Sequence, residues 1–219
     1  MRTFGTSDFW YIVQATQWTV LLSLVAFIGG GLVGLAAALA RTGTNRIARA
    51  ISVGFIQLFR GTPLLLQLFL VFFGAPVIGL EVDPWVAAAV ALALNAGAFL
   101  GEIWRGCIEA VPRGQWEAAA ALGLKYRYLL RDVILPQALK IAVPPTVGYL
   151  VQVIKGTSLA AIIGFTELTR AGQIVNNATF EPMMVFSIVA ALYFLLCWPL
   201  SLLAGRMERR LATSQARGS

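Results

Sequence analysis

Ionisable side chains lie at three positions inside otherwise apolar stretches, and these are Arg60, Glu102 and Lys155. A charge at the centre of a bilayer costs about 2.5–3.5 kcal/mol on insertion scales, so such residues are candidate ligand-binding groups. The Glu102 carboxylate can bind an ammonium or another cation. Asn95 and Phe99 precede it by seven and three residues, which places them on the same face of a predicted helix. The structural alternative for Glu102 is an i,i+3 ion pair with Arg105.

Lys155 interrupts an apolar run beside Gly156, Thr157 and Ser158, a group that can locally unwind a helix. Non-helical backbone at membrane depth is tolerated where it lines a cavity or is buried in protein. A broken helix with a cation, hydroxyls and free N–H groups suits a carboxylate, which every α-amino acid carries. Gln152 and Ser158 share this helical face. Alternatively, Lys155 reaches the membrane surface or pairs with Glu102.

The composition identifies the kind of element that positions these residues. The chain has 219 residues, of which 58% are hydrophobic and 12% are charged. Soluble domains carry about 25% charged residues, and disordered chains combine low hydrophobicity with high charge, so both classes are excluded. The absence of His excludes His-based metal sites and Ser-His-Asp triads. Cys107 and Cys197 predict no disulfide framework. The chain is therefore predicted to be an all-α polytopic membrane protein.

Five stretches approach the roughly 20 apolar residues that a membrane-spanning helix needs, at about 18–40, 51–73, 85–104, 144–164 and 183–205. The second is broken at Arg60-Gly61-Thr62-Pro63, where Arg60 has a structural pairing role as readily as a substrate role. The fourth is interrupted by Lys155. No internal repeat or linker stands out, so residues 1–219 are predicted to form one membrane domain.

The distribution of Lys and Arg predicts the orientation. The stretches 41–50, 105–143 and 206–219 hold 13 of the cations, including Arg217, and the opposite loops hold only Arg2 and Arg170. The positive-inside rule places the N-terminus outside and the C-terminus in the cytoplasm. Topology and contact with anionic membrane lipid account for the net charge of +7, so no nucleic-acid partner is expected.

Small residues and tryptophans provide weaker signals. Gly29, Gly30 and Gly31 with Gly34, and Gly97 with Gly101, give the GxxxG spacing that allows helices to approach closely. Three tryptophans are interpreted as interfacial anchors, and these are Trp85, Trp104 and Trp198.

The predicted cytoplasmic loop at about 105–143 has a pattern of its own. Good helix formers from Gln115 to Leu122 precede Gly123, which is placed where a helix C-terminus adopts a left-handed conformation. A second helix from Lys125 to Val133 is predicted to stop before Pro136. The first helix is short and rich in Ala, which suits docking into a groove of another protein. The alternative is a plain pair of interfacial helices.

This loop resembles the EAA loop of ABC-importer permeases. Glu117-Ala118-Ala119 is followed after three residues by Gly123 and after nine more by Val133-Ile134-Leu135-Pro136, with Val133 in place of the usual Ile. Four other stretches resemble segments of polar amino-acid permeases, and these are residues 60–63, 95–106, 155–159 and 167–170. Phe99, Gly101 and Gly156 depart from the residues usual at those positions.

The chain thus resembles the permease subunit of a polar amino-acid ABC importer of the histidine/glutamine/glutamate/arginine type. The resemblance implies a type I importer fold in the bacterial cytoplasmic (inner) membrane. It implies an ATP-binding cassette partner that holds ATP and Mg, a second permease chain in a homodimer or heterodimer, and an extracytoplasmic amino-acid-binding protein. It also implies that the ATPase is contacted through Glu117, Ala118, Ala119, Gly123, Leu135 and Pro136.

Our leading hypothesis is an ATP-driven importer subunit with alternating access around Lys155 and Glu102. The chain has no phosphate-loop pattern, so we expect ATP hydrolysis in a partner and no cofactor, metal or enzymatic activity here. Five spans are too few to enclose a wide pathway, so a dimer is expected. A secondary carrier is the alternative, and it predicts inverted repeats and usually more spans. A non-transporting scaffold would not explain the intramembrane charges.

Overall fold

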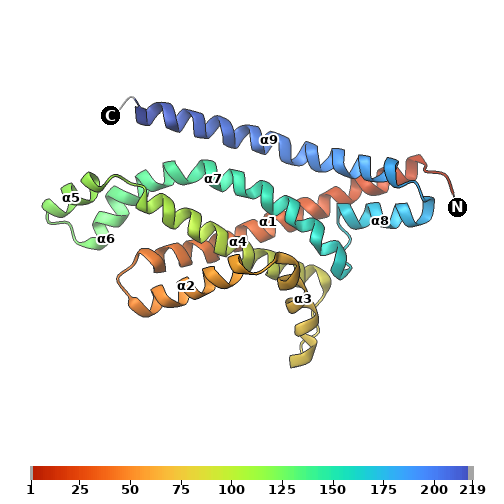
Figure 1. Cartoon of the computed structure of the whole chain (residues 1–219), viewed down its shortest axis with the longest axis horizontal. Helices are drawn as coiled ribbons and strands as arrows, with labels where there is room; N and C mark the ends of the chain where they lie inside the picture. Colours follow the sequence, from red (N-terminus) through yellow and green to blue (C-terminus); the bar gives the residue numbers. More distant parts are fainter. Residues whose placement is uncertain (1, 217–219) are drawn as a thin grey trace.

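The computed structural model describes residues 2–216, with side chains through Leu211, so Arg217 lies outside the described residues. The regular elements of the described part are all helices, joined by short irregular segments, and no strand occurs among its residues (Figure 1). The α-helices are α1 (Thr6–Thr42), α2 (Arg46–Gly61), α3 (Leu64–Gly74), α4 (Pro84–Glu109), α5 (Arg113–Ala121), α6 (Tyr126–Tyr128), α7 (Leu135–Gly156), α8 (Leu168–Thr179) and α9 (Pro182–Ala216). The 3₁₀ segments are η1 (Pro76–Ile78) and η3 (Thr157–Ile163), and η2 (Leu129–Ile134) is a π-helical turn.

Four helical stretches of the described chain are long and apolar enough to cross a membrane, and these are Thr6–Thr42, Pro84–Glu109, Tyr126–Ile163 and Pro182–Leu211. The pair Arg46–Gly61 and Leu64–Ile78 gives a fifth if it is one span bent by 104°. The bend lies at the break expected in the second apolar stretch. Thr62 is extended there, at φ −115° and ψ 142°, because Pro63 disfavours helical geometry in the residue before it.

Helices α1 and α4 pack closely against each other, and glycines lie at their contact. A Cβ on Gly30 would lie 2.5 Å from the Ala96 Cβ, and one on Gly34 would lie 3.0 Å from backbone atoms of Gly97 and Gly101. Any larger side chain at Gly30 or Gly34 would therefore push the helices apart. The GxxxG patterns of the two helices thus pack against each other, as their spacing indicates.

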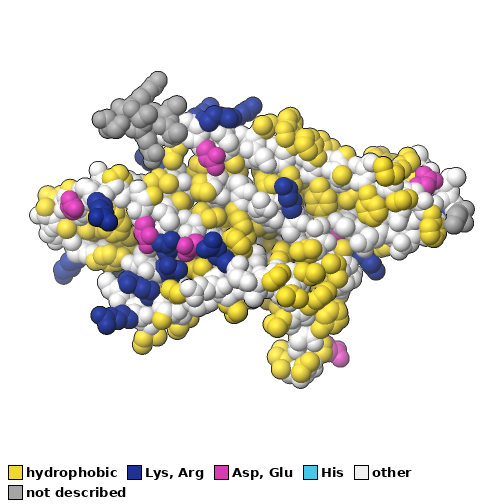
Figure 2. All heavy atoms as spheres, viewed as in Figure 1, with side chains coloured by type: hydrophobic (Ala, Val, Ile, Leu, Met, Phe, Trp, Pro, Cys, Tyr) yellow, Lys and Arg dark blue, Asp and Glu magenta, His cyan; other side chains and the backbone are white. Residues whose placement is uncertain are grey.

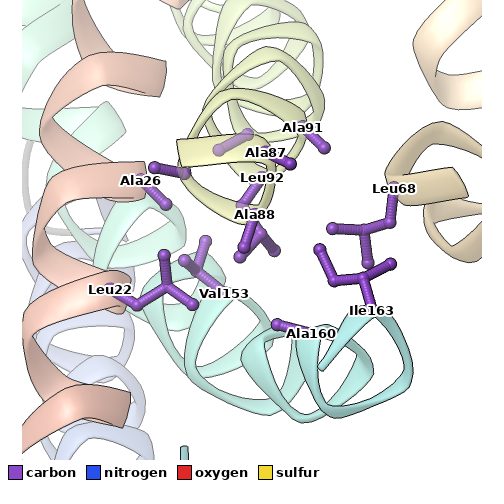
Figure 3. Packing of buried hydrophobic residues seen from close by; sticks show 12 residues of the cluster. Leu22, Ala26, Leu68, Ala87, Ala88, Ala91, Leu92, Val153, Ala160 and Ile163 are labelled. Carbon is purple, nitrogen blue, oxygen red and sulfur yellow. The ribbon is translucent and has the colours of Figure 1, made fainter. Parts of the chain in front are cut away.

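The main apolar core continues along this seam. In Figure 3, Leu22 and Ala26 of α1 lie beside Ala88 and Leu92 of α4, while Val153 of α7 approaches from below. Leu68 of α3 and Ile163 of η3 complete the cluster, and both side chains are buried. The bent second stretch and the end of the fourth are thereby fixed against the α1–α4 pair.

The helix ahead of Pro136 does not stop where the sequence predicted. The chain passes from α6 through the π turn η2 directly into α7. Pro136 lies in the first turn of α7, directly after this π turn, in which the Leu135 N–H bonds to the Leu130 carbonyl. The helix also continues through Pro144 and Pro145, which lie inside α7, although the fourth apolar stretch was expected to begin at Pro144.

The start of α1 and the end of α9 lie at opposite ends of the molecule (Figure 1). At the N-terminal end, Arg2 donates to the Asp8 carboxylate at 2.9 Å, and the Phe4 N–H donates to Glu181 at 3.2 Å. The opposite end carries α5, α6 and the turn between α1 and α2. Side chains of Lys and Arg gather over this second end in Figure 2, while apolar side chains cover α3. The N-outside orientation remains a prediction.

Candidate functional site

Five of the seven residues expected along a substrate pathway line two cavities. Arg60, Phe99 and Glu102 line a cavity of about 450 Å³ between α1, α2 and α4. Lys155 and Ser158 line another cavity, of about 330 Å³, between α7, η3, α8 and α9. The two cavities share no lining residue.

The Glu102 carboxylate is surrounded by arginines. Arg105 donates to both of its oxygens, at 2.7 and 3.0 Å, and so forms the i,i+3 pair considered from the sequence. Arg41 of α1 lies 3.4 Å away and Arg60 of α2 lies 3.8 Å away. Three helices therefore meet on one carboxylate, and its negative charge is already compensated within the chain. Glu102 thus has less capacity to bind a substrate cation than its position alone indicated.

Aromatic rings extend this cluster toward α7. The Arg60 guanidinium carbon lies 5.4 Å from the centre of the Phe99 ring, within cation–π range. Phe99 in turn stacks on Tyr149 of α7, with ring centres 5.4 Å apart and planes inclined by 18°. The Tyr149 hydroxyl donates to the Asn95 side chain at 3.4 Å. The Asn95, Phe99 and Glu102 stripe therefore contacts α7 as well as α2.

Gln67, which the sequence reasoning did not select, holds the bend between α2 and α3. Its buried amide nitrogen donates to the carbonyls of Phe59 and Thr62 at 2.8 and 3.0 Å. Its oxygen accepts from Asn95 at 3.1 Å. These bonds satisfy carbonyls that the broken helix leaves without intrahelical partners. An amide four residues after a Pro-induced break in an apolar run was the available signal.

Lys155 occupies a different environment. Among the described residues it forms no ion pair within 4 Å, so the proposed pairing with Glu102 is absent. Its cavity is lined also by Ser158, Thr169, Phe186, Val189, Ala190 and Tyr193. A cation thus faces hydroxyl groups and apolar side chains, with no carboxylate among the lining residues. Such a cavity has the charge that an anionic group requires.

The backbone after Lys155 tightens into a 3₁₀ helix instead of unwinding. Thr157 and Ser158 donate their hydroxyls to the carbonyls of Ile154 and Lys155, both at 2.7 Å. This back-bonding favours the tighter turn. Gln152 lies exposed on α7 and does not line the Lys155 cavity.

A buried carboxylate lies behind the Lys155 cavity. Glu167 is fully buried and caps α8 by accepting from the Arg170 N–H at 2.9 Å. It also accepts from the Tyr193 hydroxyl at 2.7 Å, and Tyr193 lines the cavity. Burial raises the pKa of the Glu167 carboxyl above its ordinary value. The sequence reasoning noted Glu167 only as part of a matching motif, because nothing local places Tyr193 beside it.

The connection between α4 and α7 forms a separate surface. Glu117 and Ala118 of α5 are exposed, whereas Ala119 is buried. Gly123 ends this helix at φ +74°, the left-handed conformation expected from its position. The predicted first helix, Gln115 to Leu122, corresponds to α5, Arg113–Ala121.

The inner face of α5 packs on the ends of α4 and α7. Ala119 belongs to a buried cluster with Ile108, Val111, Leu129, Ile134 and Ala138. Trp116 and Leu135 pack against its margin, and Pro136 is exposed in the first turn of α7. A force applied to α5 would therefore reach α7 through side-chain contact.

Comparison with known sequences gives matches over most of the chain. A family described as binding-protein-dependent transport system inner membrane component matches residues 30–213. The L-cystine transport system permease protein TcyB of Bacillus subtilis is 38% identical over 219 aligned positions, covering 95% of this chain and 94% of that protein. The glutamine transport system permease protein GlnP of Escherichia coli K12 is 37% identical and covers 91% and 92%.

Solved structures give the same picture of the fold. The chain superposes on a crystal structure described as an amino acid ABC transporter with histidines, with a TM-score of 0.87 and 34% identity over 91% of this chain and 94% of that one. An inward-facing structure of the MetNI methionine ABC transporter has a TM-score of 0.78 at 20% identity, covering 94% and 99%. The second likeness concerns the fold alone.

Proposed function

The chain belongs to the family of binding-protein-dependent transport system inner membrane components, and from this premise we propose that it moves a polar amino acid across the bacterial inner membrane by alternating access. It acts as the permease subunit of an amino-acid ABC importer. ATP, with Mg, is hydrolysed in a separate cassette subunit, and an extracytoplasmic binding protein delivers the amino acid. A second permease chain completes the pathway.

The observation that carries this proposal is the geometry of α5. Its outer face exposes Glu117 and Ala118, and its inner face packs through Ala119 on the ends of α4 and α7. An exposed helix of small residues fits a groove in a partner protein. The Gly123 turn releases the chain from α5 in a conformation that other residues adopt only with strain.

The same contacts give a route for coupling. Movement of α5 displaces the start of α7, and α7 carries both Tyr149 and Lys155. Tyr149 stacks on Phe99 beside the Glu102 cluster, and Lys155 faces its own cavity. ATP shifts the balance between two conformations by as much as its affinities for them differ. In this proposal, α7 occupies a different position in each of the two conformations, and ATP binding in the partner moves it through α5.

We further propose that Lys155 binds the carboxylate of the transported amino acid. The cavity offers one cation beside the hydroxyls of Thr169 and Tyr193, with apolar surface from Phe186 and Val189. A carboxylate accepts readily from an ammonium, so Lys155 is the donor in this proposal, because the Tyr193 hydroxyl already donates to Glu167. The Glu102 cluster then serves mainly to hold α1, α2 and α4 together.

Coupling is tested by Glu117→Lys and Gly123→Pro in the complex purified from native membranes through a tag on this chain. We expect each change to reduce amino-acid uptake per ATP hydrolysed at least tenfold in proteoliposomes, because the partner groove meets a reversed charge or a distorted helix end. Inserted protein should stay at the wild-type amount in membranes.

Asp132→Lys is the matched control, since Asp132 is an exposed carboxylate on the same connection and lies outside α5. It should leave coupling within twofold of wild type. Normal uptake in Glu117→Lys and Gly123→Pro would refute the coupling role. A chain that purifies without any ATPase would favour the secondary carrier.

A further inference from the structure

The bend between α2 and α3 is connected to α7 at two places, and neither connection is part of the coupling route proposed above. Helix α3 leaves the bend at 104° to α2 and projects from the body of the molecule (Figure 1). Arg60 and Gly61 come just before the bend and line the Glu102 cavity. The position of the bend therefore determines the shape of one wall of this cavity.

The first connection is a series of hydrogen bonds between side chains. The Tyr149 hydroxyl of α7 donates to the Asn95 side-chain oxygen of α4 at 3.4 Å, and the Asn95 amide nitrogen donates to Gln67 of α3 at 3.1 Å. The Gln67 amide nitrogen donates to the carbonyls of Phe59 and Thr62 at the end of α2. Asn95 also reaches the Phe59 carbonyl directly, at 3.4 Å. All donors in this series point from α7 toward the bend.

Each amide in this series takes its donor from the next helix. Gln67 and Asn95 are only 7% and 9% exposed, so water does not readily replace a lost partner. In the described chain, Tyr149 is the one donor to the Asn95 side-chain oxygen. Withdrawal of Tyr149 therefore leaves a buried acceptor unsatisfied, and such a group costs free energy until it turns to a new partner. The orientation of Gln67 depends in turn on that of Asn95.

The second connection is apolar and lies next to Lys155. Gly156 is the last residue of α7, and a Cβ placed on it would lie 3.2 Å from the Leu64 Cδ2 atom at the start of α3. The small size of Gly156 thus lets α3 pack against the end of α7. Because closely packed groups transmit displacement, movement of this end of α7 shifts Leu64 and the bend that precedes it.

We propose that Asn95 and Gln67 are positioning residues for transport, which make the α2–α3 bend follow α7. This role rests on the proposed function, because α5 must first displace α7. When α7 moves, Tyr149 no longer orients Asn95, and Asn95 no longer orients Gln67. The carbonyls at the end of α2 then lose their donors and the bend takes a second angle. Arg60 moves relative to Glu102, which changes the opening of the cavity between α1, α2 and α4.

Tyr149→Phe is the cleanest test, because it removes the hydroxyl and keeps the ring that stacks on Phe99. We expect uptake per ATP hydrolysed to fall about fivefold in proteoliposomes, the factor that one hydrogen bond commonly contributes. The melting temperature should fall by no more than about 4 °C. Gln67→Leu should lower coupling at least as much. The double variant should match Gln67→Leu alone, because both changes interrupt one series; effects that multiply would overturn the proposal.

A second readout measures the bend itself. Spin labels attached at Leu58 and Leu70, which are exposed on α2 and α3, report the distance across the bend in the purified complex in lipid. Labelled chains are diluted so that each complex carries one of them. We expect ATP to change this distance in the wild-type complex, and the change to be smaller in Tyr149→Phe and in Gln67→Leu. A purely structural role for the amides would leave the ATP-dependent change as it is in wild type.

Tyr11→Phe is the matched control, since Tyr11 is an exposed tyrosine of α1 in a cavity with Arg2 and Asp8, away from the bend. It should leave uptake per ATP and the change in distance as in wild type. If the wild-type complex couples ATP to uptake, but Tyr149→Phe and Gln67→Leu couple normally or keep the full change in distance, the role of the two amides is refuted and coupling through α5 stands. If the wild-type complex shows no ATP-driven uptake, the proposed function fails and this role fails with it.

Discussion

Glu102 and Lys155 are both charges in apolar helices, but the fold treats them in opposite ways. Glu102 lies among Arg41, Arg60 and Arg105, which come from three helices. Lys155 has no carboxylate within 4 Å among the described residues and faces a cavity. The Glu102 charge is compensated by ion pairs within the chain, whereas the Lys155 charge is available to bind an external anion. An intramembrane charge thus indicates function only after its partners are known.

The difference also separates rigid from adjustable parts. The α1–α4 seam beside Glu102 is fixed by backbone contact at Gly30 and Gly34, where no side chain can be added without moving a helix. The Lys155 cavity instead lies where α7 becomes a 3₁₀ helix and meets α8 and α9. Close packing transmits displacement, and a cavity between helices accommodates it. We therefore expect structural damage from changes on the Glu102 side and altered substrate affinity from changes on the Lys155 side.

The largest effect is expected from Glu102→Ala, which removes the one carboxylate that joins the three arginines. Removing one partner of a buried ion pair lowers the free energy of unfolding by about 3–5 kcal/mol. Glu102 is partly exposed, so we expect a smaller loss, of about 2–4 kcal/mol. The melting temperature in detergent and the yield of folded protein should both fall. Glu109→Ala removes an exposed partner of Arg105 and should cost less than about 1 kcal/mol. Equal melting temperatures for the two variants would show that the Glu102 ion pairs stabilise the fold no more than the exposed Glu109 pair does.

Lys155→Met is expected to act on substrate affinity and not on folding. A hydrogen bond to a charged group contributes about 1.5–3 kcal/mol, which corresponds to a rise in KM of roughly 10- to 100-fold. Because Lys155 is exposed and lacks an ion-pair partner in the described chain, the melting temperature should stay within 1 °C of wild type. The measurement is uptake against substrate concentration in proteoliposomes.

Lys140→Met provides the control for this change, since Lys140 is an exposed lysine on the same helix and lies outside the cavity. Its uptake kinetics should match those of the unmodified chain. If Lys155→Met and Lys140→Met behave alike, Lys155 is not a substrate ligand. If Lys155→Met instead melts at a much lower temperature, the charge has a structural role like that of Glu102.

The smallest effect is a pH dependence that Glu167 confers on stability. Burial raises the pKa of this carboxyl in the folded state, so its contribution is present below the unfolded pKa of about 4.3 and is lost as pH rises through the folded pKa. We expect the melting temperature to decline from pH 5 to pH 8 by a few degrees more in wild type than in Glu167→Gln. Gln keeps an acceptor for Tyr193 and does not ionise. Parallel pH profiles would contradict this assignment.

Local patterns predicted much of the architecture correctly. The break after Arg60 follows from Gly61 and Pro63, and the left-handed Gly123 follows from its place at a helix end. The glycine spacing indicated the close approach of α1 and α4. The stop before Pro136 was predicted wrongly, because the π turn η2 let Pro136 begin a new helical register. Trp104, predicted as an interfacial anchor, donates to Thr146 of α7 at 2.8 Å.

The sequence by itself determined that the chain is helical, membrane-embedded and equipped with an exposed Ala-rich helix, because composition, glycine spacing and turn residues act over short distances. It also indicated which charged side chains lie inside apolar stretches and are therefore candidate binding groups. Only the tertiary structure decided their roles, because partners of Glu102 and Glu167 come from positions up to 148 residues away. The hydrogen bonds of Gln67 depend on the 104° bend that brings α2 carbonyls to α3. Contacts between distant segments form only when helices pack, and these contacts determine whether a buried charge is compensated or free to bind.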